Sequence, residues 1–221
     1  MDKYSQPKLE FNSVYHIYNC GINGCNLFID DEDYERFLSR YETYIEPIAD
    51  TYAWSLLGNH FHLVVRIKKE NEIKSLVESH LLEVRTKMRT SEKKPDPTKQ
   101  FSHLFNAYAQ YFNNKYHRHG SLFERPFKRN LIDNLLYFKR CLIYVHQNPV
   151  KHGFVKNIDD YRYTSYNSVL SDKVTHLKRD IVLSVFESRS NFELEHLKLN
   201  SLEETLEDDS VINRCQSPSD C

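Results

Sequence analysis

The chain has 221 residues, a formal net charge of −1, 15 tyrosines and 13 phenylalanines. This length suits one compact domain with an appendage, and the aromatic content excludes a disordered chain or a repeat array. No apolar run approaches the roughly 18 residues of a membrane span, and the polar segment Met1–Glu10 shows no signal peptide, so we expect a cytoplasmic protein with no membrane contact.

The first half of the chain alternates between strand and helix patterns. β-branched and aromatic residues with period two predict strands, and apolar residues at helical spacing predict a helix. The predicted elements are a strand at Ser13–Cys20, a turn at Asn23–Gly24, a helix opened by Asp30–Asp33, and strands at Tyr52–Leu57 and Phe61–Ile67 joined at Gly58–Asn59.

The second half is predicted to be mostly helical, with one extended segment. The predicted elements are a helix from about Glu70 to Met88, a loop at Pro95 and Pro97, a helix with Phe101–Phe112, an extended edge or bulge segment Leu122–Ile132, a helix capped by Asp133 and stopped by Pro149, and a helix Arg179–Leu199. This order indicates an α+β fold, in which helices pack on an antiparallel sheet. Beyond Asn200 we expect disorder.

An H-x-H motif lies in the second strand of the predicted hairpin. His60 and His62 are two residues apart, so both side chains project from one face of the strand. Two imidazoles placed in this way can chelate one divalent metal. Two ordinary, partly buried histidines would give the same pattern, and Phe61 between them is expected in the core.

A second candidate lies in the predicted helix before Pro149. Tyr144 and Asn148 are four residues apart and share one helical face. An amide oxygen could complete a metal site beside a tyrosine, but a packed tyrosine and a helix-ending asparagine would look the same. Tyr163 and Asn167 have the same spacing, so spacing alone does not choose between the two pairs.

Charge is distributed unevenly along the chain. From Ser171 onward there are 6 basic and 11 acidic residues, whereas the preceding part has 24 basic and 20 acidic residues. The densest basic stretch runs from Lys115 to Arg129 and has interleaved aromatic residues, a combination that can hold phosphates and stack bases. A solvated surface is the simpler interpretation. Its cations are Lys115, Arg118, Arg125, Lys128 and Arg129.

Several other catalytic schemes find no support in the sequence. It contains no G-x-S-x-G, P-loop or G-x-G-x-x-G motif. A second H-x-H, His117 and His119, falls in a predicted loop that does not fix its geometry. The five cysteines include no C-x-x-C pair and are expected to be reduced thiols. They are Cys20, Cys25, Cys141, Cys215 and Cys221.

From about Val14 to Tyr166 the sequence resembles the REP-associated tyrosine transposases, relatives of the insertion-sequence transposases that have an HUH motif and one tyrosine. The order and separation of four segments carry the resemblance. They are Tyr15–Asn19, Gly58–Val65, Gly120–Lys128, and Tyr144–Gly153 followed by Asp160–Tyr166. Two positions depart from the pattern: Gly58 stands where the family usually has proline, and Cys20 where it often has arginine.

The resemblance implies a ferredoxin-like HUH-endonuclease fold at residues 9–170. The helix and charge patterns that follow predict a helical extension at 171–200 and an acidic tail at 201–221. The resemblance also implies that His60, His62 and Asn148 bind Mg²⁺ or Mn²⁺ and that Tyr144 is the nucleophile, and it assigns Tyr163 and Asn167 a structural role. The expected activity is cleavage and rejoining of single-stranded, hairpin-flanked DNA through a 5′-phosphotyrosine, by a monomer or a homodimer.

Two other functions remain open on the residues alone. One is a catalytically silent single-stranded DNA-binding protein on the same fold. The other is a metal-dependent phosphodiester hydrolase, which would use water at the H-x-H site and would not need Tyr144.

Overall fold

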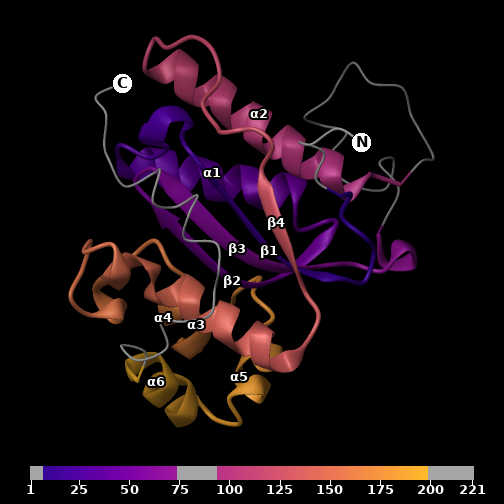
Figure 1. Ribbon diagram of the computed structural model, residues 1–221, viewed down its shortest axis with the longest axis vertical. Helices are drawn as coiled ribbons and strands as arrows, with labels where there is room; N and C mark the ends of the chain where they lie inside the picture. The colour runs from indigo at the N-terminus through magenta and orange to yellow at the C-terminus, as the bar shows by residue number, and fades with distance from the viewer. Residues whose placement is uncertain (1–6, 74–93, 199–221) are drawn as a thin grey trace.

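The computed structural model describes residues 7–73 and 94–198 of the chain. Its centre is a four-stranded antiparallel sheet of order β2–β3–β1–β4 (Figure 1), which confirms the expected α+β class. The strands are β1 (Val14–Cys20), β2 (Ala49–Leu57), β3 (His60–Ile67) and β4 (Lys128–Ile132). The hairpin strand β3 is therefore an inner strand, and β4 is an edge strand.

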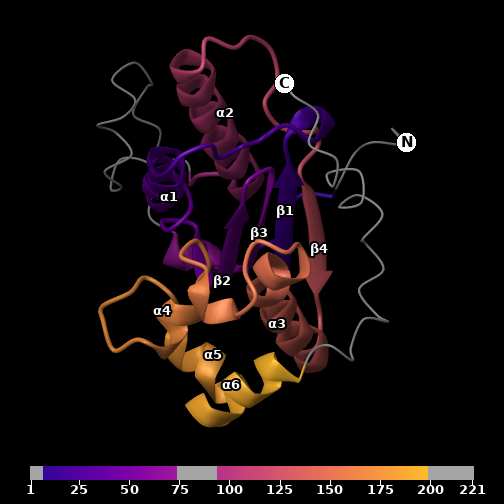
Figure 2. The same cartoon turned by 90° about the vertical axis from the view of Figure 1, so that its left-hand side faces the viewer.

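Helices cover both faces of the sheet. α1 and α2 lie on one face, and α3 with the shorter helices α4 to α6 lies on the other (Figures 1 and 2). They are α1 (Asp31–Tyr44), α2 (Pro97–Lys115), α3 (Leu135–Lys151), α4 (Tyr166–Leu170), α5 (Arg179–Val185) and α6 (Arg189–Leu197). Among the described helices, none is both long and apolar enough to cross a membrane.

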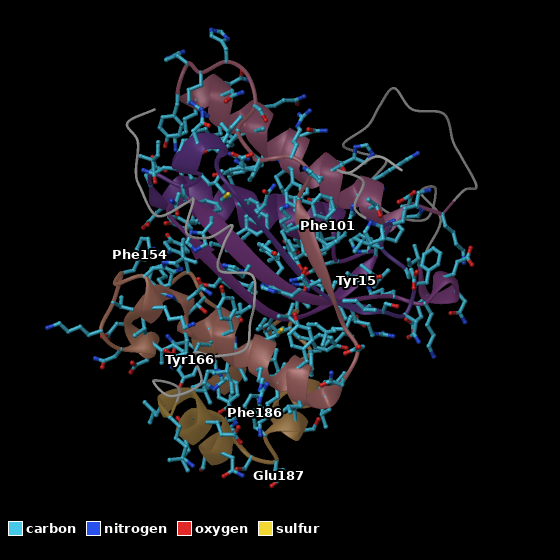
Figure 3. The ribbon with its side chains drawn as sticks, viewed as in Figure 1. Tyr15, Phe101, Phe154, Tyr166, Phe186 and Glu187 are labelled. Carbon is cyan, nitrogen blue, oxygen red and sulfur yellow. The ribbon has the colours of Figure 1, made fainter. Side chains whose placement is uncertain are left out.

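The sheet separates two apolar cores. Tyr15 and Phe101 belong to the core beneath α1 and α2, whereas Tyr166 and Phe186 belong to the core around α3 (Figure 3). Alternation along β1 and β3 sends Ile17 and Phe61 into the first core. The residues that alternate with them face α3, and they are His16, Tyr18, His60 and His62.

Two predicted boundaries of α3 are wrong. The N-cap is Asn134 rather than Asp133, because the Asn134 side chain accepts the Tyr137 backbone N–H at 2.8 Å. Pro149 lies inside the last turn instead of stopping the helix. A proline this close to the end removes little from the helix, since the His152 N–H still bonds to the Asn148 carbonyl at 3.0 Å.

The single helix predicted at Arg179–Leu199 is also wrong, because the structure has two. Glu187, labelled in Figure 3 between α5 and α6, has a φ of 66°, which a helix cannot accommodate. Ser188 then starts α6 by accepting the Asn191 N–H at 3.1 Å. Of the helix predicted at 70–88, a 3₁₀ turn at Glu70–Glu72 is described, and its part from residue 74 onward lies outside the described residues.

Three of the five cysteines lie in the described part of the chain. Cys20, Cys25 and Cys141 are buried, and no disulfide joins them. The acidic tail at 201–221, with Cys215 and Cys221, lies outside the described residues.

A chain of buried hydrogen bonds joins α3 to the C-terminal helices. His196 Nδ1 donates to the Phe192 carbonyl at 2.7 Å, so its Nε2 accepts the Nδ1 proton of His146 at 2.9 Å. His146 Nε2 then accepts the Ser165 hydroxyl at 2.8 Å, and Ser165 accepts the Trp54 N–H at 2.9 Å. Both histidines are fully buried and neutral, since burial lowers the pKa of His146 well below its ordinary value and that of His196 to about 4.

This pair should make the protein sensitive to acid. In the unfolded chain both groups titrate near pH 6.5, so the unfolded state binds more protons below that pH and the free energy of unfolding falls. The loss is up to about 1.4 kcal/mol per pH unit for each histidine, down to the folded pKa of about 4 for His196.

Glutamine at position 146 can accept from Ser165 and donate to His196, but it does not titrate. Urea unfolding of His146→Gln between about pH 7 and pH 5 should therefore show a slope shallower than wild type by up to about 1.4 kcal/mol per pH unit. Equal slopes in the two proteins would contradict this account.

Candidate active site

The two histidines of the H-x-H motif and the two candidate residues of α3 come together on one face of the sheet. His60 and His62 both point toward α3, with ring centroids 5.4 Å apart. His60 Nε2 lies 3.4 Å from the Asn148 Oδ1 atom, and the His62 ring lies 5.4 Å from the Tyr144 ring. All four side chains are buried.

His60 has an oxygen atom at each of its ring nitrogens. Its Nδ1 is 2.7 Å from Asn59 Oδ1, and its Nε2 is 3.4 Å from Asn148 Oδ1. The amides are oriented by their other contacts, since Asn59 Nδ2 donates to the Gly24 carbonyl and Asn148 Nδ2 donates to the Tyr144 carbonyl.

A neutral imidazole has one N–H and cannot donate to both oxygens. Burial, followed by the nearby His152, lowers the pKa of His60 to about 3, so the ring is neutral at pH 7. The shorter contact to Asn59 is the better hydrogen bond, so we assign the proton to Nδ1. The Nε2 lone pair then faces the oxygen of Asn148, an arrangement suited to a cation bound by both atoms.

His62 supplies a further nitrogen on the same face. Its Nδ1 lies 2.9 Å from His16 Nε2, while its own Nε2 is buried with no hydrogen-bond partner. Burial, then the neighbouring His16 and His60, lowers the pKa of His62 well below its ordinary value, so this nitrogen carries a lone pair when Nδ1 donates to His16. Two imidazole nitrogens and one amide oxygen form a donor set for a divalent metal ion.

Tyr144 packs directly against this donor set. Its ring meets His62 edge-to-face and lies 5.8 Å from the His16 ring. Lys151, one helical turn beyond Asn148, holds its ammonium 5.0 Å from the centroid of the Tyr144 ring. His152 is half-buried, with its ring 4.8 Å from that of His60.

The structure separates the basic residues of the segment 115–129. Lys128 pairs with Tyr18 in the sheet register, so its side chain lies on the face that carries His62. Arg129 alternates to the other face, where its guanidinium lies 4.5 Å from the Phe127 ring and burial lowers its pKa.

Two other residues of this segment have partners inside the protein, and one is exposed. The Lys115 ammonium lies 2.8–3.1 Å from the carboxylates of Asp30, Glu32 and Asp33. Arg118 lies over the Phe112 ring at 5.7 Å, whereas Arg125 is exposed. Contacts of the five residues with DNA stay a prediction. Of the five, Arg125 and Lys128 are the best placed to reach DNA.

The second tyrosine–asparagine pair has structural contacts. Tyr163 stacks on Tyr34 with ring centroids 3.7 Å apart, and Asn167 donates to the Asp159 carbonyl at 2.8 Å. These contacts explain why this spacing recurs without belonging to the His60–Asn148 site.

Sequence reasoning missed three residues of this site. His16 alternates with Tyr18 along β1, and Lys151 follows Tyr144 by seven residues and Asn148 by three, so each carries a periodicity signal. His152 carries none. No local signal says which strand lies beside which helix.

Two comparisons with known proteins found similar proteins. No family model matches the chain. A Haemophilus influenzae protein named as a REP-associated tyrosine transposase is 26% identical over 132 residues, which cover 59% of this chain and 67% of the relative. A solved structure of a REP-associated tyrosine transposase bound to a REP hairpin has a TM-score of 0.54 and 14% identity, and the match covers 78% of this chain and 87% of that one.

The sheet and its helices therefore have the fold of a tyrosine transposase. The chain is similar in sequence to a REP-associated tyrosine transposase, so the resemblance that its motifs indicate is confirmed.

Metal titration tests the donor set without any activity assay. Wild type should bind Mn²⁺ in calorimetry, and His62→Ala should lose that binding because it removes one of two imidazole ligands. His16→Ala should weaken it by about 10- to 100-fold, because His16 orients the His62 ring. His119→Ala, in the exposed second H-x-H, serves as the control and should bind as wild type does. Equal Mn²⁺ affinity in all four proteins would exclude a metal at His60 and His62.

Proposed function

We propose that this chain is a DNA transposase that cleaves and rejoins single-stranded DNA through a covalent bond to Tyr144. One observation carries the proposal: His60 Nε2 lies 3.4 Å from the oxygen of Asn148, one helical turn from Tyr144. The relatives named as REP-associated tyrosine transposases support an enzyme that acts on DNA, and the hairpin in the solved relative supports hairpin DNA as the substrate.

The chemical roles follow from the residue types. Mn²⁺ or Mg²⁺ on His60, His62 and Asn148 would polarise a non-bridging phosphate oxygen. His16 holds the His62 ring in orientation through its 2.9 Å contact, and Asn59 does the same for His60 at 2.7 Å. The burial of these groups keeps both imidazoles neutral and able to donate lone pairs.

Tyr144 supplies the nucleophile. Its oxygen forms a bond to phosphorus as its phenolic proton passes to water, and the P–O3′ bond breaks. The departing oxygen keeps the electron pair and takes a proton to become a 3′-hydroxyl, leaving a 5′-phosphotyrosine. A second 3′-hydroxyl can reverse the step, so no nucleotide cofactor is required. A cytoplasmic location remains part of the proposal.

Tyr144→Phe is the decisive variant. It keeps the ring that packs on His62 but removes the nucleophilic oxygen, and the loss of one hydroxyl should cost about 1 kcal/mol of stability or less. On a denaturing gel with labelled hairpin DNA and Mn²⁺, wild type should give a protein–DNA adduct and the variant none, while DNA binding survives. His60→Ala should also lose cleavage, together with Mn²⁺ binding.

The same gel, together with a native gel that reports DNA binding, separates the alternatives. Cleavage by Tyr144→Phe without an adduct would mean a metal-dependent hydrolase, and binding without cleavage by wild type would mean a silent DNA-binding protein. An adduct in Tyr144→Phe would move the nucleophile to another tyrosine, with Tyr137 and Tyr163 the first to test.

The basic segment should contribute to DNA affinity through Arg125 and Lys128. Replacing both with alanine should weaken binding across DNA sequences and reduce the slope of log K against log salt by about 1.4, as expected for two contacts to single-stranded phosphates. Lys115→Ala is the comparison, because its ammonium already lies among three carboxylates. Unchanged affinity of the double variant at low salt would return this segment to a solvated surface.

A further inference from the structure

Lys151 is a cation beside the candidate nucleophile. It is the last residue of α3, seven residues after Tyr144 and three after Asn148, and therefore lies on the face of the helix that carries both. Its ammonium is 5.0 Å from the centroid of the Tyr144 ring. The side chain is exposed to solvent.

Lys151 differs from Lys115 on α2 and Lys139 on α3 because those two lysines have carboxylate partners. The Lys115 ammonium contacts three carboxylates, and Lys139, also on α3, bonds to Glu195 at 2.6 Å. Within residues 7–73 and 94–198, no carboxylate lies at ion-pairing distance from Lys151. Its ammonium lies over the uncharged ring of Tyr144, so its positive charge is available to an anion.

We propose that Lys151 binds a non-bridging oxygen of the DNA phosphate that Tyr144 attacks, and is thus a further catalytic residue of this site. The inference rests on the proposed function and adds a residue to it. A phosphodiester that reaches the Tyr144 oxygen must come close to the ammonium over the same ring. Four methylene groups let the ammonium swing from the ring to the phosphate, and its three donors need no fixed approach.

The charge would help both the binding and the chemistry. A lysine on a phosphate releases counterions, which makes affinity depend on salt. As the tyrosine oxygen attacks, negative charge builds on the phosphoryl oxygens, and a cation already in place stabilises that charge. A residue that only packed on the Tyr144 ring would have neither effect.

The binding test uses the Tyr144→Phe background, in which no DNA is consumed. Fluorescence anisotropy with a labelled DNA hairpin bearing single-stranded arms gives affinity as a function of salt. Adding Lys151→Met should lower the salt slope by about 0.7, the value for one contact to a single-stranded phosphate. Lys151→Arg should keep the slope. Lys156→Met, an exposed lysine five residues on, removes the same charge and should change it little.

The chemical test measures the rate of adduct formation at saturating DNA, in proteins that keep Tyr144. Lys151→Met should slow it about 10- to 100-fold, less than the loss of a buried oxyanion donor because the ammonium is exposed. Lys156→Met should react at the wild-type rate, and matching melting temperatures would verify the folding of each variant.

The two tests separate the two proposals. An unchanged salt slope or an unchanged rate in Lys151→Met overturns the role of Lys151, whatever Tyr144 does. If wild type forms no adduct but Lys151→Met still lowers the slope, the covalent mechanism fails while the phosphate contact stands. Equal losses in Lys151→Met and Lys156→Met would indicate general surface charge and would also overturn the assignment.

Discussion

The site depends on the packing of α3 against β3, which brings the amide oxygen of Asn148 to 3.4 Å from His60 Nε2. Hydrogen bonds from the far sides, to Asn59 Oδ1 and to the Tyr144 carbonyl, hold both groups in place. The rest of the fold keeps α3 packed on this face of the sheet.

The two faces of the sheet have different roles, because one packs into the apolar core and the other carries the site. Phe61 points into the core beneath α1 and α2, while His60 and His62 point to α3. Burying an apolar side chain of this size contributes roughly 1.5–3 kcal/mol, whereas burying an imidazole costs free energy unless its nitrogens find partners. One strand therefore serves both the core and the site.

α3 is held from its other side as well. His146 lies between Tyr144 and Asn148 in sequence but projects away from them, into the hydrogen-bonded chain that ends at α6. The C-terminal helices share an apolar core with α3 through Phe186 and Phe192. They thus brace the helix that positions the tyrosine, although their sequence carries no motif of the site.

The sequence by itself determined what short-range backbone geometry controls. A period of two places His60 and His62 on one face, and a period of 3.6 places Tyr144 and Asn148 on one face. It did not determine that these faces meet, since 88 residues separate His60 from Asn148. Nor could it tell which cations had carboxylate partners, or whether Asp133 or Asn134 caps α3, because both side chains can cap. The meeting of the two faces and the carboxylate partners depend on contacts between segments distant in sequence, which only the packed structure decides.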